Sequence, residues 1–253
     1  MNQNTQVILK ILVILLVLVF VGLLLVKRFV YFKPSSLFLE TFEKYQEVHH
    51  RHLHGRFLDN PDSDRAVLFC HGNAGNVSQL EKTVTVLRDL GMSVLAFDYS
   101  GFGKSKGVPS EQQLYDDASS MLALLQERYG SRDIVVYGES MGGPVAAYVA
   151  LRHAIPYLIL DSPLPSIRKI IKRRYPYLSW LGSLFPEFDT AKYLEYYGGE
   201  SLLLHSRDDR VIPYDTVEDL AKLCTEHIIT TGPHLGSSFP TERMRTFLCI
   251  GKR

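Results

Sequence analysis

The chain has 253 residues, with 28 basic and 27 acidic side chains and a formal net charge of +1. Charges that nearly cancel give no field to attract a polyanion, so nucleic acid is not expected as a partner. The three cysteines, Cys70, Cys224 and Cys249, form no C-x-x-C pair, which argues against a structural zinc site.

Segment 7–26 is almost wholly apolar, and only Lys10 interrupts it. Its length matches the roughly 20 residues that a helix needs to cross the hydrocarbon core of a bilayer. The alternative is a cleaved secretory signal, but no A-x-A-like site follows the apolar residues. We therefore predict an N-terminal tail at 1–6, a transmembrane anchor at 7–26 and a juxtamembrane linker at 27–36.

The charges beside segment 7–26 predict its orientation. Three basic side chains follow the segment, namely Lys27, Arg28 and Lys33. Lys10 and the chain's amine lie at the other end, so the excess of positive charge predicts that the remaining residues, 37–253, lie in the cytoplasm. We therefore expect a single-pass membrane protein with the lipid bilayer as a partner.

Residues 37–253 have the length of one domain. Buried-type strands alternate with helical stretches such as 80–90 and 114–129. This alternation is typical of a mostly parallel sheet with helices on both faces. The early stretch 38–57 should supply antiparallel edge strands, with its histidines at exposed polar positions of a hairpin: His49, His50, His52 and His54.

Two loops follow the first buried strands. The sequence HGNAGN at 71–76 follows strand 66–70, and DYSGFGKS at 98–105 follows strand 93–97. Gly72 and Gly75 let the backbone of the first loop approach a substrate without a side chain between them. Neither loop matches G-x-x-x-x-G-K-[ST] or G-x-G-x-x-G, so we expect no phosphate-binding cofactor, and we predict no cofactor and no metal.

The pentapeptide GESMG at 138–142 follows the apolar strand 134–137 and precedes a predicted helix at 144–152. This context is that of a nucleophile elbow, a sharp turn that raises a serine above the sheet. Gly138 and Gly142 would let the strand and the helix pack closely around Ser140, the predicted nucleophile.

A hydrolase of this kind needs an acid and then a histidine downstream of its serine. Strand 201–205 leads into an acidic loop that contains Asp208 and Asp209. A last strand at 226–230 precedes a turn at 232–234, which would carry His234 back over the sheet. The order of serine, acid and histidine is therefore met.

Together with Asp161-Ser162-Pro163 after strand 157–160, these landmarks resemble the α/β hydrolases over roughly residues 37–250. The resemblance is to membrane-anchored serine hydrolases related to the prolyl-oligopeptidase and serine-aminopeptidase group. It implies an α/β-hydrolase fold, here preceded by one transmembrane helix. In that family the acid lies four residues after the histidine of H-G-x-x-D-x-x-V-P, which favours Asp209. The chain has Ser206 where the family commonly has glycine, so Asp208 stays open.

The predicted roles follow from acyl-transfer chemistry. His234 would take the proton of Ser140 and return it to the leaving group, and the aspartate would orient the imidazole. The backbone N–H groups of Met141 and Asn73 would form the oxyanion hole.

The connection at 163–199 is a cap-like insertion, and in this fold it lies over the serine and shapes the substrate pocket. Five basic residues cluster at 168–174 within it, namely Arg168, Lys169, Lys172, Arg173 and Arg174, followed by the aromatic-rich stretch 175–188. The basic face is either a solvated helix face or a surface for anionic lipid headgroups or an acidic substrate group.

The expected function is hydrolysis of an ester or thioester, possibly an amide, through an acyl-enzyme. Acyl transfer or peptide cleavage uses the same three residues and stays open. A different class, a non-catalytic membrane-bound binding or scaffold protein, would be expected to lose one of Ser140, Asp209 or His234, and all three are present.

Overall fold

The structure is a computed structural model that describes residues 3–29, 32–39, 45–174, 176–177, 179, 185–235 and 239–248. The chain divides into two compact units, residues 1–33 and 34–253. The domain boundaries expected from the sequence, with a linker at 27–36 and a domain at 37–253, stay predictions.

The first unit consists of helix α1 (Gln3–Phe29). In the part of the chain that the structure describes, no helix has both the length and the apolar character that crossing a membrane requires. The prediction of a single-pass anchor at 7–26, with the remaining residues in the cytoplasm, is therefore wrong.

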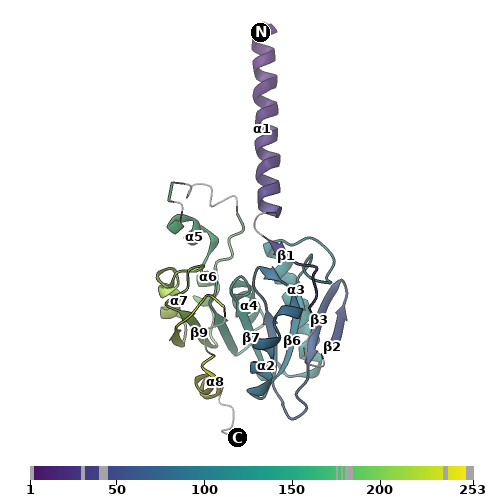
Figure 1. The fold of residues 1–253 in the computed structure, drawn as a ribbon, viewed down its shortest axis with the longest axis vertical. Coiled ribbons are helices and arrows are strands. Elements are labelled where there is room, and N and C mark those ends of the chain that lie inside the picture. Colours follow the sequence, from purple (N-terminus) through teal and green to yellow (C-terminus); the bar gives the residue numbers. More distant parts are fainter. Residues whose placement is uncertain are drawn as a thin grey trace. The chain divides into compact units, whose positions relative to one another are not determined.

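The strands and helices beyond α1 alternate along the chain, as the sequence predicts (Figure 1). The strands are β1 (Lys33–Pro34), β2 (Gln46–His50), β3 (Leu53–Leu58), β4 (Ala66–Cys70), β5 (Ala74–Gly75), β6 (Ser93–Asp98), β7 (Ile134–Glu139), β8 (Tyr157–Asp161), β9 (Glu200–Ser206) and β10 (Glu226–Thr230). The helices are α2 (Glu81–Asp89), α3 (Glu111–Arg128), α4 (Gly142–Arg152), α5 (Ile167–Arg174), α6 (Thr190–Leu194), α7 (Glu218–Leu223) and α8 (Thr241–Phe247).

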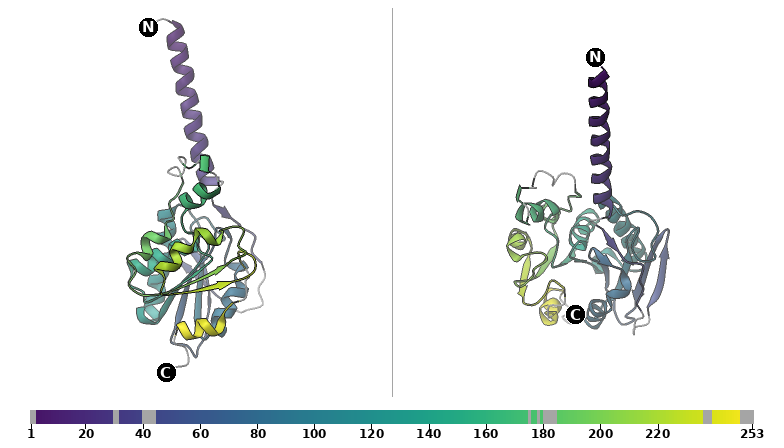
Figure 2. Two further views of the ribbon diagram at one scale, coloured as in Figure 1. Left: turned by 90° about the vertical axis from the view of Figure 1, so that its left-hand side faces the viewer. Right: turned by 45° about the horizontal axis from the view of Figure 1, so that its top comes forward.

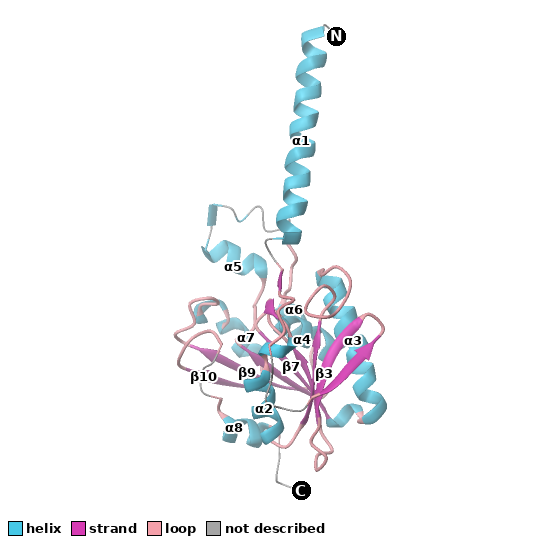
Figure 3. Cartoon of the chain, turned by 45° about the vertical axis from the view of Figure 1, so that its right-hand side comes forward, coloured by secondary structure: helices cyan, strands magenta, loops and turns pink. Residues whose placement is uncertain are grey.

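The central sheet has the strand order β10-β9-β8-β7-β4-β6-β3-β2. Six neighbouring strands, from β10 to β6, pair in parallel, whereas β3 pairs antiparallel with both β6 and β2. The strands fan out with the twist expected of an open sheet (Figure 3). The mostly parallel sheet and its antiparallel edge are thus as predicted, although residues 40–44 of the early stretch lie outside the described residues. Because parallel strands end at the same edge, the loops after β4, β7, β8, β9 and β10 gather there.

Strands β4, β6, β7 and β9 are buried on both faces along nearly their whole length, which explains their continuous apolar runs. On one face, alternate residues such as Phe69, Tyr137 and Leu204 pack against α2 and α8. The intervening residues point to the opposite face, where α3 and α4 contact β4 and β7. Helix α5 lies at the opposite end of this unit from α8 (Figure 2).

The insertion 163–199 begins against the elbow, because the N–H of Leu164 donates to the carbonyl of Ser140 at 2.9 Å. Three of the five basic residues at 168–174 are paired with carboxylates, in the pairs Arg168–Glu187, Lys169–Asp219 and Arg173–Asp215. These pairs favour the interpretation of α5 as a solvated helix face. Residues 175, 178 and 180–184 of the aromatic-rich stretch lie outside the described residues.

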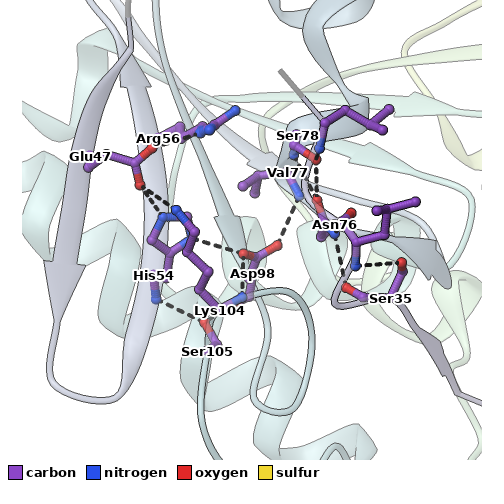
Figure 4. Close-up of polar contacts among 12 residues, drawn as sticks. Ser35, Glu47, His54, Arg56, Asn76, Val77, Ser78, Asp98, Lys104 and Ser105 are labelled. Carbon is purple, nitrogen blue, oxygen red and sulfur yellow. Dashed lines mark hydrogen bonds and ion pairs between the residues drawn. The ribbon is translucent and has the colours of Figure 1, made fainter. Parts of the chain in front are cut away.

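One histidine of the early hairpin departs from the prediction. His54 is 1% exposed, because β3 pairs with β6 so that His54 lies opposite Asp98. Its Nδ1 lies 2.9 Å from Asp98 Oδ2, and its Nε2 contacts Glu47 (Figure 4). Asp98 also accepts the N–H of Val77 at 2.9 Å. The expectation of an exposed position is wrong for His54, which instead links the hairpin to the turn after loop 71–76.

The far end of the insertion is held by Glu111, in the first turn of α3. Its carboxylate accepts the N–H groups of Glu187 and Phe188 at 2.6 and 2.8 Å and the hydroxyl of Tyr115 at 2.7 Å. Two of these donors are backbone groups of a connection with little regular structure of its own. Glu111 therefore fixes where the insertion returns to the domain.

Replacement of Glu111 by alanine is expected to lower the free energy of unfolding by about 2 kcal/mol, because it removes hydrogen bonds to a charged group and leaves their donors unpaired. Denaturant unfolding measures this change. Glu127→Ala, on the exposed surface of the same helix, is the matched control and should change stability by less than about 0.5 kcal/mol. Equal effects of the two substitutions would contradict the role of Glu111.

Candidate active site

The candidate residues come from loops that follow four strands of the sheet. Loop 71–76 follows β4, Ser140 follows β7, Asp209 follows β9 and His234 follows β10. All these strands run parallel, so residues far apart in sequence meet at the carboxyl edge.

Ser140 occupies a strained turn between β7 and α4. Its φ is +52°, in the left-handed region that residues other than glycine seldom adopt. The surrounding backbone holds it there, since its N–H donates to the carbonyl of Asp161 at 2.9 Å. Its own carbonyl accepts from Gly143 and Leu164, each at 2.9 Å. The turn thus has the geometry of the nucleophile elbow that the sequence predicts.

Close backbone packing explains the glycines of the elbow. A Cβ at Gly142 would lie 1.9 Å from the carbonyl oxygen of Cys70, and one at Gly138 would lie 2.5 Å from the carbonyl oxygen of Gly142. Both distances are far below a van der Waals contact. Gly72 differs, because a Cβ there would meet Ser140 Cβ at an ordinary 3.4 Å.

His234 lies between Ser140 and Asp209. Its Nε2 is 3.0 Å from Ser140 Oγ, and its Nδ1 is 2.6 Å from Asp209 Oδ2. With Nδ1–H donating to the carboxylate, Nε2 has a lone pair free to accept the serine proton. The imidazole is 13% exposed, so a small reactant can reach it.

The side chain of Asp209 is fully buried and held from both oxygens. Oδ1 accepts the N–H groups of Val211 and Ile212, each at 2.8 Å. Burial alone would raise the pKa of Asp209, but the hydrogen bonds from His234 and from these backbone groups outweigh it and hold the pKa below its ordinary value. The carboxylate is therefore ionised at neutral pH.

Asp208, the alternative acid, faces a different group. Its Oδ2 accepts the N–H of Gly232 at 3.0 Å, and among the described residues no hydrogen bond joins it to the His234 ring. Ser206, where the family commonly has glycine, donates its hydroxyl to the carbonyl of Gly232 at 2.6 Å. Asp208 and Ser206 therefore tie the acid loop to the backbone of the histidine loop.

Loop 71–76 passes close to the serine at Gly72. Gly75 has a φ of +83°, a conformation that residues other than glycine rarely adopt. Met141 directly precedes α4, and among the described residues no hydrogen bond from its N–H is found. The first N–H groups of a helix have no partner within the helix, so this one is available to an anion. The N–H groups of Met141 and Asn73 stay the predicted oxyanion donors.

Two carboxyl groups lie next to the elbow, one buried and one half-buried, and the sequence reasoning assigned neither of them a role. Glu139 and Asp161 end the neighbouring strands β7 and β8 and are directly opposite each other. Burial, together with the charge of Asp161, raises the pKa of Glu139 to about 8. Burial likewise raises the pKa of Asp161, although hydrogen bonds from Tyr137 and Ser162 oppose it. The strand ends themselves could have revealed this pair, since adjacent parallel strands end side by side.

Within the described part of the chain, no group of three or more His, Cys, Asp or Glu side chains is placed to hold a metal ion. The expectation that the chemistry needs no cofactor stays a prediction.

Comparison with known proteins agrees with this geometry. Residues 61–198 match the family model "Serine aminopeptidase, S33". The protein YfhR of Escherichia coli is 34% identical over 179 residues, which cover 67% of this chain and 62% of YfhR. The lysophosphatidylserine lipase ABHD12 of Danio rerio is 32% identical over 187 residues, covering 65% of this chain and 48% of that protein. The chain thus spans about three fifths of the length of the first relatives.

The fold is that of solved α/β hydrolases. The esterase Pf2001 of Pyrococcus furiosus superposes with a TM-score of 0.69 at 23% identity, covering 86% of this chain and 96% of the esterase. The family match extends over more than half of the chain. The chain therefore belongs to the S33 serine aminopeptidase family of the α/β-hydrolase superfamily.

The strain at Ser140 predicts a difference between two inactive variants. Ser140→Gly should be more stable than Ser140→Ala by about 1 kcal/mol, because glycine adopts a positive φ without the steric cost that alanine retains. Chemical denaturation of both proteins measures the difference. Equal stability, or a more stable alanine variant, would contradict a strained left-handed backbone at this position.

Proposed function

We propose that the protein is a serine hydrolase that cleaves an ester or thioester bond through an acyl-enzyme on Ser140, with His234 as base and Asp209 as acid. The observation that carries this proposal is the chain of hydrogen bonds from Ser140 Oγ to His234 Nε2, at 3.0 Å, and from His234 Nδ1 to Asp209 Oδ2, at 2.6 Å. Nucleophile, base and orienting acid in this geometry are the arrangement that acyl transfer requires.

In the first half of the reaction, Ser140 Oγ attacks the carbonyl carbon of the substrate while His234 Nε2 takes the hydroxyl proton. The ionised Asp209 holds the tautomer with Nδ1–H and stabilises the imidazolium that forms. When the tetrahedral intermediate collapses, the bond to the leaving group breaks and Nε2–H protonates that group. The acyl group then remains on Ser140.

The negative oxygen of the tetrahedral intermediate needs donors that are already in position. We propose the N–H groups of Met141 and Asn73 for this role, and each such donor typically lowers the barrier by about 3 kcal/mol. The close approach of loop 71–76 to the serine at Gly72 supports the assignment.

In the second half, a water molecule loses a proton to His234 Nε2 as its oxygen attacks the acyl carbon. Collapse of the second tetrahedral intermediate breaks the bond to Ser140 Oγ, which recovers its proton from the imidazolium. The products are the free acid and the regenerated enzyme. An alcohol, thiol or amine acceptor in place of water would make the same site an acyltransferase.

The names of the relatives support an ester substrate, since one is called an esterase and another a lysophosphatidylserine lipase. The description of the family as serine aminopeptidases supports a second candidate, cleavage of a peptide bond. We favour esters and thioesters, because their leaving groups depart more readily than amines and so demand less of the general acid.

A fluorophosphonate probe and nitrophenyl esters of short and long acyl chains test the proposal directly. The wild type should label and turn over at least one ester. Ser140→Ala and His234→Ala should abolish both, and Asp209→Asn should reduce kcat by about 10⁴-fold, because the imidazole would lose its orienting acid.

Asp208→Asn is the matched control for the acid and should keep activity within a few-fold of the wild type, because Asp208 bonds to Gly232 and not to the imidazole. If activity is lost in Asp208→Asn but not in Asp209→Asn, then Asp208 is the acid. A folded wild type that neither labels nor hydrolyses any ester or peptide would remove the proposal and favour a non-catalytic binding protein.

A further inference from the structure

Ser162 follows β8 and lies beneath the histidine loop. It is 1% exposed and has a φ of +48°, the second strained residue next to the elbow after Ser140. Its hydroxyl oxygen lies 2.9 Å from the carbonyl oxygen of His234 and 3.1 Å from Asp161 Oδ1. Its N–H donates to the carbonyl of Leu204 in β9 at 2.8 Å. Both the backbone and the hydroxyl of Ser162 are therefore fixed.

From this geometry we infer that Ser162 is a positioning residue for the proposed reaction: its hydroxyl, itself held by Asp161, fixes the main chain at His234 so that the imidazole stays over Ser140. The inference rests on the proposed function and adds to it a group that does not touch the reacting atoms.

The histidine loop needs such a support. The ring of His234 is held by Ser140 and Asp209, but during the reaction its bond to Ser140 breaks as the proton moves. Its backbone is tied at Gly232, two residues earlier, by Ser206 and Asp208. Among the described contacts, the bond from Ser162 is the tether at His234 itself, so it restrains the imidazole in the steps when the ring is least restrained.

The protonation state of Asp161 decides which acceptor receives the hydroxyl proton of Ser162. A serine hydroxyl has one proton to donate, but Ser162 contacts two acceptors. An ionised Asp161 would be the stronger acceptor and would draw the proton away from the carbonyl of His234. A protonated Asp161 donates to Ser162 Oγ, and Ser162 can then donate to His234. Oδ2 of Asp161 already accepts the hydroxyl of Tyr137 at 2.6 Å, so the proton belongs on Oδ1.

The surroundings of Asp161 favour its protonated form. From β7 it faces Glu139 and Tyr137, from the loop after β9 it faces Asp209, and from the loop after β10 it faces His234. Burial raises the pKa of Asp161, and the charge of Asp209 adds to this, whereas the hydrogen bonds from Tyr137 and Ser162 and a charged His234 lower it. Two carboxyls at adjacent strand ends cannot both ionise without a large cost, so Glu139 and Asp161 together retain a proton at neutral pH. The 2.9 Å contact between Ser162 Oγ and the carbonyl oxygen of His234 is the reason to assign this shared proton to Asp161.

Substitutions at Ser162 test the role of its hydroxyl, and substitutions at Asp161 test the role of the carboxyl proton. Ser162→Gly removes the hydroxyl but tolerates the positive φ, so this variant should fold, and it should lower kcat by about 5- to 10-fold with KM unchanged. Ala154→Gly, at another strained residue with a φ of +49°, is the matched control and should leave kcat unchanged. Ser162→Ala is a second test and should lose the same activity as Ser162→Gly.

At Asp161 the asparagine and alanine variants should differ. An asparagine amide can donate to Ser162 Oγ at every pH, as a protonated carboxyl does, so Asp161→Asn should keep kcat within about twofold of the wild type at neutral pH. It should also remove the loss of kcat that ionisation of Asp161 causes in the wild type as the pH rises. Asp161→Ala should fall to the level of Ser162→Gly, and adding Ser162→Gly to Asp161→Asn should restore that loss.

The measurement is the ratio of each variant's kcat to that of the wild type, with nitrophenyl esters as substrates, between about pH 5 and pH 9. Wild-type kcat in Ser162→Gly, or equal damage from Asp161→Asn and Asp161→Ala, would overturn the inference while leaving the proposed function intact. A readout without turnover is the low-field NMR signal of the His234 Nδ1 proton, identified by its loss in Asp209→Asn. This signal should broaden in Ser162→Gly, and an unchanged signal would overturn the inference even in a protein that hydrolyses no ester.

Discussion

Ser140 is held at a φ of +52° because its N–H is bonded to β8, its carbonyl is bonded to α4 and to the insertion, and α4 lies too close to β4 for any side chain at residue 142. The rest of the site depends on this constraint. The turn directs the serine hydroxyl to the carboxyl edge, where the loops after β9 and β10 bring Asp209 and His234. A relaxed turn would place the same residues at the same edge without aligning them.

Three carboxyl groups lie at the same edge, and their surroundings give them different pKa values. Asp209 is ionised because backbone N–H groups and His234 bond to both of its oxygens. Burial raises the pKa values of Glu139 and Asp161, and the hydrogen bonds from Tyr137 and Ser162 to Asp161 do not outweigh it. One carboxylate therefore supports the imidazole by its charge, and we propose that another supports the histidine loop by its proton. Different local hydrogen bonding gives two neighbouring aspartates different protonation states.

Much of this could be predicted from the sequence. The sheet could be predicted because strands buried on both faces appear as continuous apolar runs. The candidate site could be predicted because the order of Ser140, Asp209 and His234 fits one fold. Segment 7–26 was correctly expected to be helical, but the prediction that this helix crosses a membrane was wrong. His54 was misjudged because its burial depends on pairing with β6, a contact distant in sequence. Ser162 was only a landmark, because its role depends on a bond to His234 across 72 residues.

Acylation of Ser140 can be detected by mass spectrometry of the protein quenched in acid during turnover of a nitrophenyl ester. One acyl group per chain is expected, located on the tryptic peptide 133–152, which contains Ser140 as its only hydroxyl besides those of its two tyrosines. The adduct should be absent from Ser140→Ala. Turnover without an adduct on this peptide, or with an adduct elsewhere, would contradict acylation of Ser140.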